Sequence, residues 1–133
     1  MADTAISWID ALWIGAGNVG VRVTADPHSY LQVNGSLALK QTAVTASFTY
    51  DVTGYLVSAD ATLGAITATL PTAVGITGRV YGIKKIDSSV NAVTIDGAGT
   101  ETIDGALTWS TATQWAGVFI MSNGANWVKI ATF

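Results

Sequence analysis

From Val19 to the C-terminus, the chain is a succession of short runs of β-branched and aromatic residues, interrupted by turn-forming pairs that contain glycine. These pairs are Asn34-Gly35, Thr53-Gly54, Asp96-Gly97, Asp104-Gly105 and Asn123-Gly124. Many short strands at such spacing are typical of sandwiches and barrels. The runs predict strands at 19–24, 30–33, 37–40, 45–50, 55–58, 65–70, 80–86, 92–96, 106–109, 116–122 and 126–131. We therefore expect an all-β fold, either an antiparallel β-sandwich or a jelly-roll-like barrel.

The last two runs predict the clearest hairpin, in the segment WAGVFIMSNGANWVKIATF. Asn-Gly is the preferred pair for a two-residue type I′ turn, although Ser122 and Ala125 leave room for a longer loop. Trp127 lies in this hairpin, and we interpret it as a core or inter-subunit residue.

Residues 3–14 form a separate short segment, in which Asp3 or Thr4 can cap a helix that Gly15 would end. A helix this short is marginal in water, so it needs a surface to dock on. We expect residues 1–20 to be an attachment arm or a short helix with a glycine linker, and residues 21–133 to be the β-sandwich domain. The candidate contact residues are Trp8, Ile9, Leu12 and Trp13, because large aromatic side chains dominate contact energies. The alternative is that the tryptophans pack on the domain's own core.

Gly15, Gly17 and Gly20 have the G-x-G-x-x-G spacing of a dinucleotide-binding loop. That loop requires a helix directly after it and an acidic residue about 20 positions later. Here the next residues alternate as a strand does, Pro27 closes the stretch, and 30–42 contains no acid. We interpret the glycines as a flexible linker and expect no cofactor.

The low charge of the chain constrains its surface. Half of the residues are hydrophobic and 11% are charged, against about 25% in ordinary domains. Such a surface stays soluble if it is rich in Thr, Ser, Asn and Gly, or if a permanent assembly buries it; we expect both. The net charge is −3 and the cations are scattered, so we expect no nucleic-acid partner. Lys84 and Lys85 are adjacent, and in a strand they point to opposite faces.

The N-terminus has no cation before its apolar run, and Asp3 and Asp10 interrupt that run. It resembles neither a signal peptide nor a membrane span. We expect no membrane partner and synthesis without export.

Few residues could support catalysis. Cysteine is absent, and His28, the single histidine, follows Pro27 in an expected exposed loop. Paired carboxylates could act as acid and base or bind calcium, and the candidates are Asp87, Asp96, Glu101 and Asp104. Each lies beside Gly, Ser or Thr, where Asp and Glu serve turns. We therefore predict no enzyme activity, no catalytic residues and no metal. Trp109, Trp115 and Tyr81 are candidates for stacking on sugar rings, with burial in the core as the alternative.

The segment 55–133 carries a series of motifs: YLVSADATLGAITATLPTA, GRVYGIKKIDSSVNAVTIDGAGTETIDG and SNGANWVKI. Together they resemble a module of bacteriophage virion proteins, found in tail fibres, head fibres and other particle-surface proteins. The resemblance implies a homotrimeric β-module in which uncharged faces meet around a threefold axis, and it brings no catalytic residue.

The chain carries no collagen-like, coiled-coil or repetitive shaft in its sequence. The resemblance therefore favours a capsid decoration protein or short head fibre, on the particle surface and made in the host cytoplasm. Its partners would be itself, as a homotrimer, and the major capsid protein or another virion protein. The alternative is a tail fibre or tail-associated receptor-binding or glycan-binding module.

Overall fold

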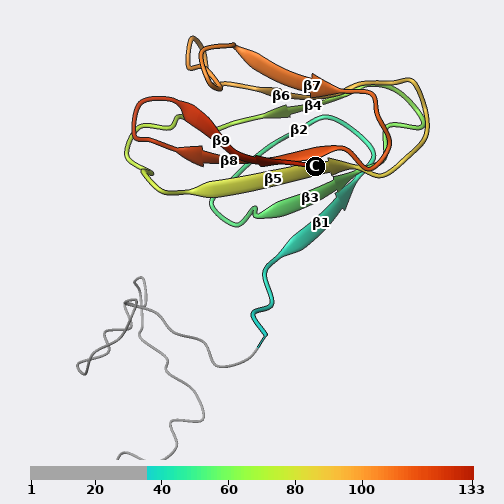
Figure 1. Ribbon diagram of the computed structural model, residues 1–133, viewed down its shortest axis with the longest axis horizontal. Coiled ribbons are helices and arrows are strands. Elements are labelled where there is room, and N and C mark those ends of the chain that lie inside the picture. Colours follow the sequence, from blue (N-terminus) through green and yellow to red (C-terminus); the bar gives the residue numbers. More distant parts are fainter. Residues whose placement is uncertain (1–35) are drawn as a thin grey trace, which may run out of the picture. The chain divides into compact units, whose positions relative to one another are not determined.

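The computed structural model describes residues 36–133, and these form strands joined by turns and loops (Figure 1). The predicted strands 19–24 and 30–33, the start of the domain at residue 21 and the attachment arm lie outside the described residues. Residues 38–133 form one compact unit. Within the described range, no helix is long and apolar enough to cross a membrane. The strands are β1 (Gln41–Val44), β2 (Phe48–Thr49), β3 (Leu56–Ala59), β4 (Ile66–Thr69), β5 (Val80–Lys85), β6 (Val93–Asp96), β7 (Thr108–Thr111), β8 (Gly117–Ser122) and β9 (Trp127–Thr132).

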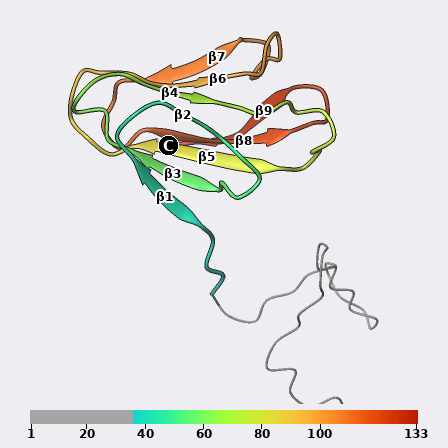
Figure 2. The ribbon, with the colours of Figure 1, turned by 180° about the vertical axis from the view of Figure 1, so that it is seen from behind.

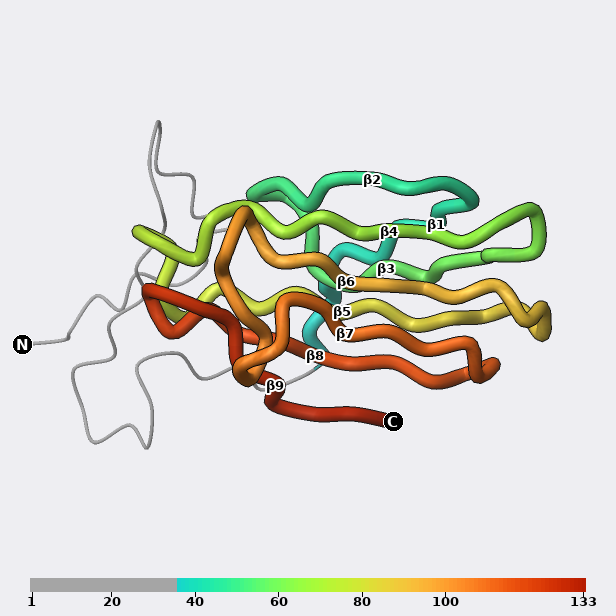
Figure 3. The backbone as a smooth tube through the Cα atoms, turned by 90° about the horizontal axis from the view of Figure 1, so that it is seen from above, coloured from blue at the N-terminus to red at the C-terminus, as the bar shows by residue number. Residues whose placement is uncertain are grey.

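The strands form two sheets that pack face to face, which confirms the predicted β-sandwich. One sheet has the order β1-β3-β5-β8-β9, and the other has the order β2-β4-β6-β7. Figures 1 and 2 show the two layers from opposite sides, and Figure 3 shows the four-stranded layer from above.

The prediction of antiparallel sheets was wrong, because both sheets are mixed. From β1 to β6 the chain alternates between the sheets, so each strand pairs with the strand two places earlier. The two strands of such a pair run in the same direction, and β1-β3-β5 and β2-β4-β6 are therefore parallel. Only β7, β8 and β9 pair antiparallel with their neighbours.

Most predicted strands within the described range are present, with shifted ends. The prediction at 37–40 was wrong, since the first strand begins at Gln41, and the run 45–50 is a strand only at Phe48–Thr49. Exposed Thr45, Ala46 and Ser47 precede that strand, and the Ser47 hydroxyl accepts a hydrogen bond from the Thr67 N–H.

The core lies between the sheets and consists of alternate strand residues, such as Ile66 and Ala68 from one sheet. Three aromatic rings lie next to one another across the core. The ring centroids are 4.5 Å apart for Tyr50 and Tyr81 and 5.5 Å apart for Tyr81 and Trp127. The Tyr50 hydroxyl donates to the Gly82 carbonyl oxygen at 2.7 Å. Trp127 is fully buried, so the core interpretation is confirmed. The hairpin before it turns at Asn123-Gly124, with Gly124 at a φ of 93°.

Candidate binding surfaces

The outer side of the four-stranded sheet is polar. Its core-facing residues alternate with hydroxyl and carboxyl side chains, and Thr94 Oγ1 lies 2.9 Å from Ser110 Oγ on the neighbouring strand. We call this side the threonine face; its members are Thr67, Thr69, Thr94, Asp96, Thr108 and Ser110. It is the kind of surface that stays solvated without many charges.

The outer side of the five-stranded sheet is aromatic. Phe119 alternates with buried Val118 and Ile120 on β8, and its ring covers Gly82, where a Cβ would lie 2.4 Å from Phe119 Cε1. The Phe133 ring covers Gly117 in the same way, at 2.6 Å from a Cβ there. Because Gly82 and Gly117 have no Cβ, the Phe119 and Phe133 rings pack directly against the backbone there.

Three neighbouring rings form a row on this side of the sheet, and Lys84 lies between the row and a fourth ring. Tyr55 and Phe133 each lie 5.9 Å from Phe119 between ring centroids. Lys84 Nζ then lies 5.3 Å from the Phe133 ring and 5.7 Å from the Trp115 ring. We call this side the aromatic face and define it by these four rings. Its one cation lies between two of the rings, where the ring faces stabilise the positive charge.

Trp115 is the most exposed ring of the aromatic face, with 57% of its surface accessible. It lies in the turn before β8 and has a φ of 68°. A bulky residue in this left-handed region is a genuine outlier, and such strain collects at functional sites. The turn therefore holds a large apolar side chain in solvent at an energetic cost.

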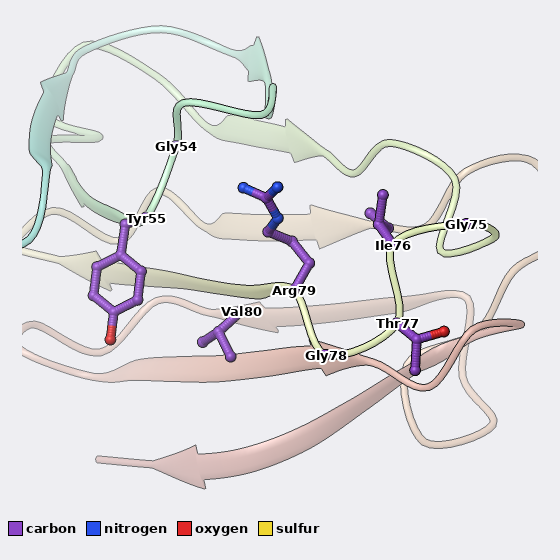
Figure 4. Close-up of a pocket in the computed structure, with 8 residues that line it drawn as sticks. All are labelled: Gly54, Tyr55, Gly75, Ile76, Thr77, Gly78, Arg79 and Val80. Atoms are coloured by element: carbon purple, nitrogen blue, oxygen red, sulfur yellow. The ribbon is translucent and has the colours of Figure 1, made fainter. Parts of the chain in front are cut away.

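A cavity of about 550 Å³ opens beside this face (Figure 4). Its walls are Gly54 and Tyr55 on one side and residues 75–80 on the other. Arg79 is the one charged side chain among these residues, and its Nη1 donates to the Val52 carbonyl oxygen at 2.8 Å. Tyr55 belongs to both the cavity and the aromatic face.

Lys84 and Lys85 point to opposite faces, as predicted. Lys85 is fully buried, and its Nζ donates to Asp87 Oδ1 at 2.6 Å and to Ser89 Oγ at 3.2 Å. Asp87 Oδ2 accepts from the Ala61 N–H at 2.7 Å. Desolvation acts to raise the pKa of Asp87, but the hydrogen bonds from Lys85, Ser89 and Ala61 outweigh it and hold the pKa well below its usual range. The Asp87 carboxylate thus links the loop that contains Ala61 to the loop that contains Ser89.

Glu101 has a similar structural role. It accepts from the Thr72 hydroxyl, from the Ala73 N–H at 2.8 Å and from Trp127 Nε1 at 3.3 Å. Its partial burial acts to raise the pKa, but these hydrogen bonds outweigh that effect and lower it. Asp104 pairs with Lys129 at 3.4 Å and has a φ of 49° in its turn. Within residues 36–133, no three His, Cys, Asp or Glu side chains gather as a metal site would require.

No protein-family model matches the chain, and no curated protein matches it either. The candidate functions therefore depend on the residues and surfaces described above.

The other candidate residues differ in their exposure to solvent. Tyr81 is buried in the core, Trp109 packs against the core, and Trp115 alone of the three stacking candidates is exposed. Trp8, Ile9, Leu12, Trp13, the glycine motif and His28 lie outside the described residues.

Sequence reasoning did not select Phe119, Phe133 or Arg79. One signal for Phe119 was present in the run GVFIMS of β8, whose first five residues are all apolar or glycine. A strand without alternation is covered on both faces. For Phe133 and Arg79 we find no comparable signal.

Proposed function

We propose that this protein is a non-enzymatic structural protein of a bacteriophage virion, which decorates or stabilises the capsid surface as a homo-oligomer. The observation that carries the proposal is the contrast between the two outer sides of the sandwich. One side is covered by threonines and suits solvent, and the other presents a row of aromatic rings that suits burial against protein. The resemblance of segment 55–133 to phage virion modules supports the same conclusion.

The aromatic face has the chemistry of a subunit interface. A fully covered aromatic side chain buries about 150–250 Å², and a specific interface covers roughly 800 Å² on each partner. Trp115 and Phe133 are 57% and 49% exposed, whereas Tyr55, Phe119, Leu56 and Met121 are half-buried, so these residues supply part of such an area. We propose that copies of the chain, arranged as a homotrimer, bury the exposed end of this face at Trp115 and Phe133 and leave Tyr55 accessible.

The proposed attachment segment is a different part of the sequence. Residues 1–20 carry Trp8, Ile9, Leu12 and Trp13, which we propose bind the major capsid protein or another virion protein. A tail-associated receptor-binding or glycan-binding module is the second candidate function, and exposed Trp115 beside Lys84 favours it.

Light scattering tests the oligomer. The purified protein should have three times the 13.7 kDa chain mass. Replacing the two most exposed rings, in Trp115→Ser with Phe133→Ser, should give monomers, because these rings fill the proposed interface. The matched control is Thr108→Ala with Ser110→Ala on the threonine face, which should keep the trimer. A monomeric parent protein, or a trimer that survives loss of both rings, would refute this interface.

Cryo-electron microscopy of intact particles tests the location. Density at regular positions on the head is expected for a decoration protein, whereas density confined to the tail would favour the second candidate. Deleting residues 1–14 should abolish attachment and leave the β-domain folded. Saturation of bare particles by the truncated protein would contradict the role of the arm.

A further inference from the structure

Three of the eight residues that line the cavity beside the aromatic face are glycines (Figure 4). Gly54, Gly75 and Gly78 contribute no side chains to its walls, and the space beyond Gly75 and Gly78 is open, since a Cβ at either would meet nothing within 4 Å. Both of these glycines have positive φ values, of 80° and 84°. The cavity is wide open to solvent and has a volume of about 550 Å³; small-molecule sites measure roughly 300–1,000 Å³.

Arg79 gives this cavity its charge. Its hydrogen bond to the Val52 carbonyl oxygen fixes the guanidinium group, which has five N–H donors in all. The ion pairs within residues 36–133 join Lys85 to Asp87 and Lys129 to Asp104, so Arg79 has no carboxylate partner in this range. A planar guanidinium group of this kind recognises a carboxylate with two parallel hydrogen bonds.

Tyr55 supplies the second element of recognition. It is half-buried at one end of the cavity beside Val80, and Figure 4 shows the Arg79 side chain rising between Tyr55 and Ile76. A flat aromatic side chain packs well against the C–H face of a sugar ring, and the glycine walls leave room for that ring. A phosphate dianion would favour a second cation, and the residues that line the cavity include only Arg79.

We propose that this cavity binds an acidic sugar, whose carboxylate pairs with Arg79 and whose ring packs against Tyr55. The ligand class is a hexuronic acid or a similar carboxylated monosaccharide, either free or as one unit of a polysaccharide. The inference goes beyond the proposed capsid role and does not depend on it, because the cavity belongs to a single chain and its Tyr55 lies outside the proposed interface at Trp115 and Phe133.

The test is a titration of the ¹⁵N-labelled full chain with sodium glucuronate, followed by amide chemical shifts. Saturable shifts are expected at Gly54, Tyr55 and residues 75–80. Glucose, which lacks the carboxylate, and acetate, which lacks the ring, should each bind at least about tenfold more weakly, a difference of roughly 1.4 kcal/mol. A parallel titration with polyglucuronate distinguishes a free sugar from a polysaccharide as the natural ligand. Tighter binding of the polymer than of the monosaccharide indicates a polysaccharide, and equal binding indicates a free sugar.

Two variants and one control assign the roles. Arg79→Gln should weaken glucuronate binding at least about tenfold, and Tyr55→Leu should weaken binding of glucuronate but not of acetate. Lys129→Gln removes a cation that belongs neither to the cavity lining nor to the aromatic face, and it should leave the affinity unchanged. Unchanged amide shifts outside the cavity show that each variant is folded, and Arg79→Lys replaces Arg79→Gln if folding fails. Absence of saturable shifts with glucuronate, equal binding of glucose, or full affinity in the Arg79 variant would overturn the proposal.

Discussion

At Gly82 the sheet has no room for a side chain, because the Phe119 ring occupies that space. Gly82→Ala should therefore lower the free energy of unfolding by about 1–3 kcal/mol, the usual cost of overpacking. Urea unfolding measures the change. A fully stable Gly82→Ala protein would mean that the Phe119 ring does not lie on this glycine.

Gly64 and Gly75 are matched controls for that substitution. A Cβ at Gly64 would meet nothing within 4 Å, and its φ is not in the left-handed region. Gly64→Ala should be neutral or should stabilise the protein by up to about 1 kcal/mol. Gly75 is equally open but has a φ of 80°, so Gly75→Ala should cost about 1–2 kcal/mol through backbone strain alone. Equal effects at all three positions would show that neither space nor φ decides the outcome.

The Lys85–Asp87 pair makes an asymmetric prediction. Asp87→Ala leaves a fully buried ammonium group with Ser89 Oγ as its remaining acceptor. Lys85→Met fills the same space without a charge, and Asp87 keeps its hydrogen bonds from Ala61 and Ser89. Each variant leaves one buried charge without its ion partner, but the Asp87 carboxylate keeps more hydrogen bonds than the Lys85 ammonium group does. Asp87→Ala should therefore lower the urea midpoint further than Lys85→Met does. The reverse order would contradict this view of the pair.

Among the elements, most strands after β2 were predictable, whereas their assignment to sheets was not. Local pattern located β5 and β8 closely, because Val80–Lys85 and Gly117–Ser122 are long runs bounded by turns. The buried pair Val57 and Ala59 of β3 reads like the buried pair Ile66 and Ala68 of β4, yet these strands lie in different sheets. Nothing in either run indicates its sheet, so the parallel pairing could not be derived.

The same limit applies to the binding surfaces. Trp115 could be proposed from its own context, because it is a flat aromatic residue with polar neighbours in the sequence. Phe119, in contrast, packs on Gly82, which is distant in sequence. The register of β5 against β8 places the two residues side by side. Arg79 likewise depends on a loop that contributes Gly54 and Tyr55 from elsewhere in the chain.

Position within a sheet should decide how fast the backbone exchanges hydrogen with solvent. β5 and β8 are inner strands with partners on both sides, whereas β1 is an edge strand with exposed or half-buried side chains. Amide exchange measured by NMR should therefore be slowest at Ile83 and Ile120 and much faster in β1. Equal protection of β1 in the purified protein would show that another copy covers this edge.

At the scale of the whole molecule, the free energy of unfolding should fall at acid pH. The pKa values of Asp87, Asp51 and Glu101 are lowered from ordinary values of 3.8, 3.8 and 4.5. The unfolded chain therefore binds these protons more readily than the folded protein does. The stability that these carboxylates contribute is complete above their ordinary pKa values and is lost as the pH falls through the lowered ones.

Thermal melting should thus be nearly constant between about pH 7 and pH 5, and the midpoint should drop below about pH 4. Asp87→Asn removes one of the three groups, so the drop between neutral and acid pH should be smaller than in the parent protein. Lys129→Gln, which leaves these groups intact, is the control. An undiminished drop in Asp87→Asn would assign the acid sensitivity to other groups.

The alternation of strands between the two sheets also orders events during synthesis. Each strand from β3 to β6 pairs with a strand made before it, so its partner has already left the ribosome when it emerges. The other edge of β5 stays unpaired until β8 has been synthesised. β8 also supplies the core residues Val118 and Ile120. A nascent chain that stops short of Gly117 therefore carries β5 with an unpaired edge, and such edges recruit other chains into aggregates.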